Sequence, residues 1–409
     1  MAHSDGMDGC PPLFGPGFDA DPYPAYDWLR RHAPVQRIDL PGGAWAWLVT
    51  RYPDARRALA DPILAKDPVR ACEAWRRAGL GLPLDHRPSL ARHMLNADAP
   101  DHSRLRRLVS HAFPPRRTEL LRQRAEEITD RLLAALAPRG SADLIAELAY
   151  PLPIAIICDL LGVPEADRAD FHRFASVIDS AEASAVEDVT RATDALDDYL
   201  AALVAEKQTA PADDMLSDLV AAHAGGVISA EELTSTAFLL LVAGHETTVA
   251  LIGNGLLALL RHPEQAAAAR ADPSRLPAIV EEVLRYDGPV RNATWRFPIE
   301  STELGGVTLR PGEPVLVSLL AANRDPEVFG QAEEFDPDRD GRPHLAFGVG
   351  PHFCIGAALA RIEGEVAIGA VLRRFPDLTL GAPPDELRWW PSPIMRGLFA
   401  LPVTFAPTS

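Results

Sequence analysis

The residue with the strongest chemical signal is Cys354, which lies in the glycine-rich segment Phe347-Gly-Val-Gly-Pro-His-Phe-Cys-Ile-Gly356. Three glycines in ten residues allow the backbone to bend and to approach a bound group closely. A helix is predicted for residues 355–375, directly after the cysteine. Backbone N–H groups at a helix N-terminus favour a thiolate. The segment therefore predicts an anionic sulfur ligand.

Two other interpretations of this segment exist. A lone cysteine in a glycine-rich turn is more often a buried structural residue than a ligand. A nucleotide-binding loop is excluded by spacing, because Gly348 and Gly350 are followed by Phe353 where GxGxxG needs a third glycine. Other motifs must decide between a ligand and a structural residue.

Glu282 and Arg285 form a second candidate constellation. Their spacing of three on a predicted helix puts both side chains on one face, where they can pair. The alternative is an ordinary surface ion pair, which contributes only about 0–1 kcal/mol. Spacing alone leaves both interpretations open.

The segment Ala243-Gly-His-Glu-Thr-Thr248 interrupts a long apolar stretch. Glycine, a charge and two threonines are poor residues for a buried helical face unless they have a function. A zinc site of the HExxH type is excluded because position 249 is valine. A helix irregularity with Glu246 in solvent is the remaining alternative.

Together these segments resemble the cytochrome P-450 family. The cysteine segment matches the haem-binding signature FGxGxHxCxG at every fixed position, including Gly348 and Gly356. Glu282 and Arg285 match ExxR, and the 243–248 segment matches AGxE/DTT. The resemblance extends over nearly the whole chain, from Asp21 to the tail. In that family the thiolate promotes cleavage of the O–O bond.

The resemblance implies haem b, with Cys354 as the axial iron ligand and Phe347 beside the sulfur. Dioxygen would be the co-substrate. In the long helix Gly244 would let the helix open for dioxygen, Thr247 would donate a hydrogen bond to it, and Glu246 would supply protons. Ala243 lies one turn before Thr247 on the same face. The resemblance also implies a buried scaffold of Glu282, Arg285 and Arg339.

Two haem propionates need cationic partners. The resemblance assigns this role to His102 and Arg106, which are spaced i, i+4, and to His352 and Arg296. Between Val290 and Arg296 the chain has one residue more than the family spacing, so Arg291 is the substitute candidate. For each cation the alternative is a solvated surface charge, which is the commoner fate of arginine.

The elements that must position these residues predict a mainly α fold with small β-sheets. A capping box at Ser229 and Glu232 opens a helix that reaches about Arg261 and is roughly 50 Å long. Haem is expected between this helix and the helix after Cys354. We expect a single domain over residues 1–409, with a flexible N-terminal segment of about 1–20. Further expected elements are a helix at 21–32, a hairpin at 35–50, a long surface connection at 65–95, helices from 101 to 285, strands at 290–317 and short strands after 378.

Composition restricts the function classes. A net charge of -17 argues against nucleic acid as a partner. The four cysteines contain no CxxC pair, so neither a disulfide framework nor a zinc ribbon is indicated. The N-terminus lacks the basic and apolar regions of a secretory signal. The apolar run 237–244 is much shorter than the ~20 residues of a membrane span. These features predict a cytoplasmic protein that does not enter a membrane.

Electrons are expected from separate proteins, because no flavin or nicotinamide signature is present. The resemblance implies a ferredoxin and a ferredoxin reductase. The ferredoxin would dock on cations gathered on the cysteine side of the haem. The candidate docking cations are Arg104, Arg106, Arg107 and Arg361.

The substrate is expected to be a small apolar molecule. By resemblance it is a macrolide, a polyketide or another secondary metabolite that is hydroxylated or epoxidised. Its pocket is expected to involve the 70–95 connection, helices around 170–190, Leu239, Val242, Ala243, Asn292 and the turn near Ile394, although each is also plausible as core. The alternatives are a peroxide-driven haem oxidase, an oxidative-coupling enzyme, and a non-catalytic haem sensor or carrier.

Overall fold

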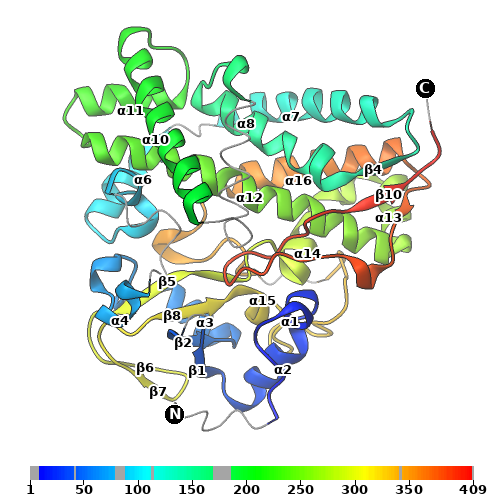
Figure 1. Cartoon of the computed structure of the whole chain (residues 1–409). Helices are drawn as coiled ribbons and strands as arrows, with labels where there is room; N and C mark the ends of the chain where they lie inside the picture. The colour runs from blue at the N-terminus through cyan, green and yellow to red at the C-terminus, as the bar shows by residue number, and fades with distance from the viewer. Residues whose placement is uncertain are drawn as a thin grey trace.

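The computed structural model describes residues 9–40, 43–78, 88–111, 115–168, 186–339 and 343–407. Helices make up most of it, and the largest sheet lies to one side of them, next to the first helices of the chain (Figure 1). The helices are α1 (Pro16–Ala20), α2 (Tyr23–His32), α3 (Tyr52–Ala60), α4 (Glu73–Arg77), α5 (Pro88–Ala91), α6 (Asp101–His111), α7 (Pro115–Leu136), α8 (Pro151–Leu161), α10 (Val186–Thr209), α11 (Met215–Ala224), α12 (Ala230–Arg261), α13 (Pro263–Ala271), α14 (Leu276–Asp287), α15 (Leu319–Asn323) and α16 (Ala357–Arg374).

The strands form three small sheets. They are β1 (Val35–Asp39), β2 (Trp45–Val49), β3 (Leu64–Ala65), β4 (Ser141–Asp143), β5 (Asn292–Pro298), β6 (Thr302–Leu304), β7 (Val307–Leu309), β8 (Val315–Ser318), β9 (Thr379–Leu380) and β10 (Pro402–Thr404). The largest sheet has the order β1-β2-β8-β5-β3, and β4-β10-β9 and β6-β7 form the others. Strands β1 and β2 are the expected hairpin, with Val35 opposite Val49, while β2 and β8 run parallel.

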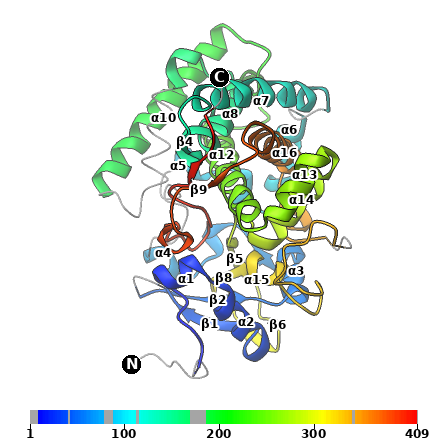
Figure 2. The same ribbon diagram turned by 90° about the vertical axis from the view of Figure 1, so that its right-hand side faces the viewer.

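Helix α12 runs through the middle of the molecule, between α8 and α10 on one side and α14 and α16 on the other (Figure 2). The predicted capping box is present, since Ser229 accepts the Glu232 N–H and the Glu232 side chain accepts the Ser229 N–H. Small residues let the neighbours approach closely. A Cβ added at Gly244 would lie 2.9 Å from Ile157 of α8.

Helices α12 and α16 run in the same direction where they pack. A Cβ at Gly364 would lie 3.3 Å from Leu251, and a Cβ at Gly255 would lie 2.7 Å from Ile368. From the first contact to the second, the chain advances by four residues on both helices, so the two helices are parallel. The segments that precede these contacts, around 243–247 on α12 and around 354 before α16, must lie at the same end of the pair.

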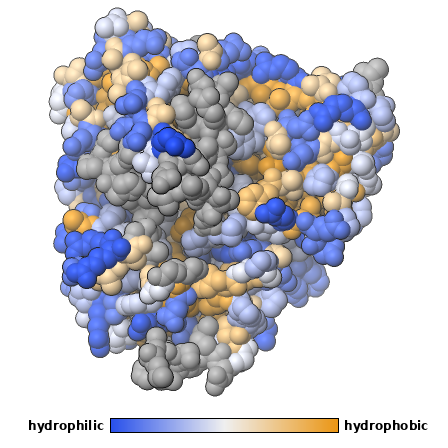
Figure 3. Space-filling model, viewed as in Figure 1, coloured by the Kyte–Doolittle hydropathy of each residue, from blue (hydrophilic) through white to orange (hydrophobic). Residues whose placement is uncertain are grey.

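Helix α12 is also apolar and long enough to cross a membrane, which the short apolar run at 237–244 did not indicate. However, 72% of its most apolar window is buried inside the fold, as is usual for the core helix of a globular protein. The outer surface mixes residue types, and Figure 3 shows hydrophilic and hydrophobic side chains interspersed over one face. The length of α12 is thus explained by its central position.

Most expected elements are confirmed. The helix at 21–32, the hairpin, the helical region from 101, the strands after 290 and the helix after Cys354 are all present. The 65–95 connection contains short helices in its described parts, and residues 79–87 lie outside the described residues. Within the N-terminal segment expected to be flexible, the structure describes α1, where Asp19 is buried and pairs with Arg291 at 3.0 Å. Residues 1–8 lie outside the described part.

Candidate active site

The cysteine loop is a tight turn that ends at the N-terminus of α16. Gly348 and Gly350 have φ values of 70° and 80°, a region that favours glycine. The Cys354 N–H donates to the Phe347 carbonyl at 2.9 Å, and this bond closes the loop. A Cβ at Gly350 would lie 3.1 Å from the Ala60 Cα, so the turn is packed against α3. The glycines therefore fix the direction in which the cysteine points.

The Cys354 thiol is accessible, although protein atoms surround it on most sides. Burial raises the pKa of the thiol. The Gly356 backbone N–H and the charges of Arg106 and Arg361 act in the opposite direction and favour the thiolate. A soft metal would shift this balance further, because binding to a metal deprotonates a thiol. The environment therefore suits a metal-bound thiolate.

The 243–248 segment of α12 lies at the same end of the helix pair as Cys354. Ala243 is exposed although it lies within a largely buried helix. Thr247 is half-buried and its hydroxyl donates to the Ala243 carbonyl at 3.0 Å. Helix α12 is continuous here, so Gly244 does not open it in this structure. Its visible role is the close packing against Ile157.

His245 and Glu246 take different positions on this helix. His245 is fully buried, with Nδ1 3.1 Å from the Leu241 carbonyl, and burial lowers its pKa. Glu246 is half-buried. The motif thus combines a packed histidine with an acid and a hydroxyl near the accessible Ala243.

A cluster of basic side chains lies beside the cysteine loop. The rings of His102 and His352 are 4.1 Å apart, centroid to centroid. Burial and the charges of Lys66, Arg296 and Arg106 lower the pKa of His352 to about 2. These residues come from α6, β5, the cysteine loop and the segment after β3. The structure therefore brings together the four predicted propionate partners and adds Lys66.

Lys66 is the site residue that the sequence did not predict. It is buried, and its ammonium donates to the Thr294 hydroxyl and to the Trp295 carbonyl, the latter at 3.0 Å. The Asp98 carboxylate accepts the backbone N–H groups of Lys66 and Asp67. The only sequence signal was a lysine directly after the apolar residues 63–65, which is too common to interpret.

The extra residue before Arg296 is absorbed by an irregularity in β5. Ala293 lies opposite Val317 and Arg296 opposite Val315, so three steps on β5 match two on β8. Such a bulge redirects the side chains that follow it. Arg296 is buried, and its Nη1 donates to the Leu64 carbonyl at 3.2 Å.

Arg291, the substitute candidate, lies elsewhere. It pairs with Asp19 at 3.0 Å, and its guanidinium lies 4.8 Å from the centre of the Phe18 ring. Arg291 therefore anchors the N-terminal helix α1, and Arg296 is the arginine that belongs to the basic cluster.

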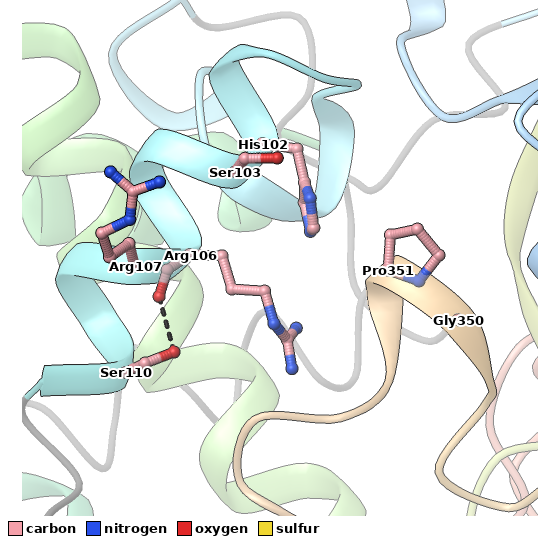
Figure 4. Close-up of a pocket in the computed structure, with 7 residues that line it drawn as sticks. All are labelled: His102, Ser103, Arg106, Arg107, Ser110, Gly350 and Pro351. Atoms are coloured by element: carbon pink, nitrogen blue, oxygen red, sulfur yellow. Dashed lines mark hydrogen bonds between the residues drawn. The ribbon is translucent and has the colours of Figure 1, made fainter.

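A surface cleft of about 570 Å³ opens beside the basic cluster. His102 and Arg106 point from α6 toward the turn that carries Gly350 and Pro351, whereas Arg107 points away from it (Figure 4). The Ser110 hydroxyl donates to the Arg106 carbonyl at 2.8 Å. The cleft therefore lies between α6 and the Gly350–Pro351 turn of the cysteine loop.

These residues fit a haem group. An accessible thiol at a helix N-terminus can ligate the iron, and the basic cluster can hold two carboxylates. His102 Nε2 and Arg296 Nε are buried and have no hydrogen-bond partner within the described part of the chain. Buried polar atoms normally have partners, so these atoms are suited to a bound anionic group.

Glu282 and Arg285 form a buried, two-pronged ion pair. Arg285 donates through Nε and Nη2 to Glu282 at 2.8 and 2.7 Å. It also donates to the carbonyls of Asn323, Ala332 and Glu334.

Arg339 joins this scaffold, with its Nε 3.6 Å from a Glu282 oxygen. Asn323 continues it toward the cysteine loop, since its side-chain oxygen accepts the Leu345 N–H at 2.6 Å. The surface-pair alternative is therefore excluded for Glu282 and Arg285.

Two of the four expected docking cations pair with carboxylates outside the cleft. Arg104 pairs with Glu232 at 2.5 Å and Asp101 at 2.9 Å. Arg361 pairs with Glu281 at 2.6 Å. Only Arg106 and Arg107 of the expected set line the cleft beside the cysteine loop. The expected set of four cations thus includes two that make ion pairs and two that line the cleft, and docking of a ferredoxin there stays a prediction.

The predicted substrate residues are partly brought together. The Ile394 carbonyl accepts the backbone N–H groups of Arg291 and Asn292 at 2.7 and 3.3 Å, so Asn292 and the Ile394 turn are adjacent. Leu239 is buried and Val242 half-buried on α12, one turn or less before Ala243. Residues 169–185 lie outside the described residues, and so does most of the expected helical part of the pocket.

The chain is similar to known proteins over nearly its whole length. The sequence profile of the family described as cytochrome P-450 matches residues 154–396. Cytochrome P-450 107B1 of Saccharopolyspora erythraea is 48% identical, over 95% of this chain and 96% of its own. The 6-deoxyerythronolide B hydroxylase of the same organism is 44% identical, over 97% and 99%. The tirandamycin C-bound P-450 monooxygenase TamI superposes with a TM-score of 0.90 at 40% identity, over 96% and 99%.

The names of these relatives describe monooxygenases and hydroxylases. They support haem and dioxygen as cofactor and co-substrate, and a small substrate that is oxidised with electrons from redox partners. They give no support to a peroxide-driven oxidase, a coupling enzyme or a non-catalytic haem carrier. The chain belongs to the cytochrome P-450 family and is a haem-thiolate monooxygenase.

Proposed function

We propose that this monooxygenase hydroxylates or epoxidises a macrolide, a polyketide or a related apolar secondary metabolite. The observation that carries the proposal is the 44% identity to 6-deoxyerythronolide B hydroxylase over almost the whole of both chains. The tirandamycin C-bound neighbour supports the same class. Leu239, Val242, Asn292 and Ile394 are the residues that we infer to contact the substrate. Three of them are apolar, which suits an apolar molecule with few polar groups.

The proposed roles of the site residues follow from their positions. When bound, haem supplies oxygen activation, which the thiolate of Cys354 promotes. Glu246 moves protons inward, and the Thr247 hydroxyl positions them near Ala243, on the face where Ala243 leaves space. Phe347, Gly348 and Gly356 hold the ligand loop in shape.

The propionates are proposed to lie within the basic cluster of His102, Arg106, Arg296, His352 and Lys66. Buried carboxylates need such charge-assisted hydrogen bonds. Arg296 donates through Nη1 to the Leu64 carbonyl, and its buried Nε has no hydrogen-bond partner within the described part of the chain. This Nε and the buried His102 Nε2, which also has no partner there, are suited to the carboxylates.

Electrons are proposed to come from a ferredoxin and its reductase in the cytoplasm. The cleft lined by Arg106 and Arg107 beside Pro351 offers positive charge close to the cysteine loop. Such charge favours association with an acidic partner. The described cysteines are all free thiols, as is usual in a reducing compartment.

The test is an optical titration of the ferric holoprotein with 6-deoxyerythronolide B and tirandamycin C, with myristic acid as a linear apolar comparison. We expect saturable spectral changes for at least one polyketide. With a ferredoxin and its reductase, mass spectrometry should then find a product that has gained one oxygen atom. The variant Ala243→Leu should keep the haem spectrum but lose binding, because a larger side chain fills the exposed position. Tighter binding and oxidation of myristic acid alone would contradict the proposed substrate class.

A further inference from the structure

Glu281, the residue before Glu282, makes an ion cluster of its own. Its two carboxylate oxygens accept Arg361 Nε at 2.6 Å and Arg361 Nη2 at 3.0 Å. His344 Nε2 lies 3.2 Å from the second oxygen. Partial burial raises the pKa of Glu281, but His344 and Arg361 outweigh it and lower the pKa to about 2. Glu281 is therefore a firmly ionised carboxylate.

This cluster is more than a single surface ion pair. Isolated surface pairs contribute about 0–1 kcal/mol and hold their partners loosely. Arg361 is held in a two-pronged arrangement, which adds geometric precision. The Ala346 N–H donates to His344 Nδ1 at 3.2 Å, which holds the ring beside Glu281, although Nε2 makes no hydrogen bond to the described residues. Glu281 thus connects α14 to α16 and to the start of the cysteine loop.

The cluster fixes a cation over an aromatic ring of the loop. The Arg361 Cζ atom lies 4.5 Å from the centre of the Phe347 ring, within the range of a cation–π contact. The His344 ring centre lies 6.0 Å from the same ring. Phe347 in turn accepts the Cys354 N–H through its carbonyl at 2.9 Å. A continuous set of contacts therefore runs from Glu281 through Arg361 and Phe347 to Cys354.

The two charges have opposite effects on the sulfur. The Arg361 guanidinium lies over the ring of Phe347, whose carbonyl accepts the Cys354 N–H, so its positive charge lies close to the cysteine loop. A positive charge near the ligand attracts its electrons and stabilises the reduced metal, and a negative charge beside it cancels part of that field. Charge and contacts around the ligand are among the means by which a protein sets the potential of a thiolate-ligated haem.

We propose that Glu281 and Arg361 form a positioning pair that sets the reduction potential through Phe347 and Cys354, and that Arg361 is not a docking residue for the redox partner. The proposal rests on the haem-thiolate function and on Cys354 as the iron ligand. It gives Arg361, which is a candidate docking cation by sequence, a role in contacts with Glu281 and Phe347 of its own chain.

The test is a double-mutant cycle on the ferric–ferrous equilibrium of the purified holoprotein, measured by spectroelectrochemistry without any redox partner. Glu281→Gln keeps a hydrogen-bond acceptor and leaves Arg361 uncompensated, so the potential should rise. Arg361→Met keeps the length and loses the charge, so the potential should fall. Each shift should be about threefold in the equilibrium, or roughly 28 mV for one electron. The double variant should return close to the original value.

Glu365→Gln is the matched control, because Glu365 also pairs on α16, with Arg122 at 2.9 Å, but is not in contact with the cysteine loop. It should leave the potential unchanged. Unchanged potentials in both Glu281→Gln and Arg361→Met, with an intact thiolate spectrum, would overturn the proposal. So would an Arg361→Met variant that alters only the rate of reduction by ferredoxin, since that result assigns Arg361 to docking.

The carbon monoxide spectrum of the ferrous protein separates this proposal from the function on which it rests. If the unaltered protein lacks the thiolate signature, the assignment of Cys354 fails. If a charge-removing variant does not retain haem, Glu281→Asp and Arg361→Lys are measured instead. Arg361→Lys keeps the charge but loses the two-pronged geometry. The reduction potential of Arg361→Lys should therefore shift less than that of Arg361→Met. An equal shift of the potential in both variants would overturn the role of charge.

Discussion

Thr247 places a hydroxyl on the face of α12 that carries the exposed Ala243. Its hydroxyl donates to the Ala243 carbonyl one turn earlier, so the oxygen is held on the face where Ala243 is exposed. The next residue, Thr248, has the same chemistry but is buried, with a longer bond of 3.4 Å to the Gly244 carbonyl. Of these two threonines, Thr247 is the more accessible, which suits the role in proton delivery that we propose for it.

We predict that Thr247→Ala lowers product formed per electron consumed by roughly tenfold, because a positioned proton donor contributes at least that much to catalysis. Substrate binding should change little. The measurement is product against NADPH oxidised, with a ferredoxin and its reductase as electron source. Thr247→Ser should restore most of the yield, and Thr248→Ala is the control. Equal yields in Thr247→Ala and the unaltered protein would remove Thr247 from the mechanism.

At the residue scale, the sequence predicted what short motifs define and missed what only folding brings together. Spacing made Cys354 and the pair of Glu282 and Arg285 candidates, and the resemblance to the cytochrome P-450 family assigned their roles. Lys66 could not, because nothing in residues 63–67 indicates that the lysine will lie near His352, almost 290 positions away. A buried cation whose neighbours are distant in the sequence leaves no local sequence pattern that predicts it.

At the element scale, glycines set how closely α12 approaches its neighbours. Gly255 faces α16 and α14, and a Cβ there would lie 2.7 Å from Ile368 and 3.4 Å from Val283. The close approach of α12 and α16 fixes the relative positions of the 243–248 segment and the cysteine loop. The packing of these two helices is therefore part of the site.

We predict that Gly255→Ala lowers the free energy of unfolding by about 1–2 kcal/mol. Overpacking costs about 1–3 kcal/mol, and the better helix propensity of alanine offsets up to about 1 kcal/mol. Adding Ile368→Val removes the clashing methyl group and should recover part of the loss in a denaturant titration. Gly17→Ala in α1 is the control, since a Cβ there meets nothing within 4 Å. An additive double variant would show that the two residues do not interact.

The bulge in β5 shows the limit of prediction at this scale. The sequence revealed one extra residue before Arg296, and counting alone could not decide whether Arg291 or Arg296 faces the basic cluster. A bulge leaves the strand ends in register with β8 and absorbs the extra residue in between, which no periodicity records. The type and order of the elements were predictable, whereas side-chain direction after an irregularity was not.

At the scale of the whole molecule, Glu363 is an ionisable residue that is buried in the core of the fold. It lies on α16, almost fully buried, and its Oε2 has no partner in the described part of the chain. Burial raises the pKa of Glu363 from 4.5 to about 8. Between those values the folded protein keeps a proton that the unfolded chain has lost. Stability must then fall as the pH rises through this window and level off above it.

We predict that Glu363→Gln removes this loss of stability at rising pH. Relative to the unaltered protein, the variant should gain stability as the pH rises from about 5 to about 8. The total gain should be on the order of a few kcal/mol, at about 1.36 kcal/mol per pKa unit. Denaturant titrations at several pH values measure it. Parallel pH profiles for Glu363→Gln and the unaltered protein would show that Glu363 is not protonated in the fold.

The most direct test of the central claim, that Cys354 ligates the haem iron, is the carbon monoxide difference spectrum of the ferrous holoprotein and of Cys354→His. The unaltered protein should show the red-shifted Soret band of a thiolate ligand, since a thiolate donates more electron density to the iron than an imidazole. Cys354→His should bind haem within the same basic cluster but lose that band. A thiolate band that persists in Cys354→His, or that is absent from the unaltered protein, would contradict the account.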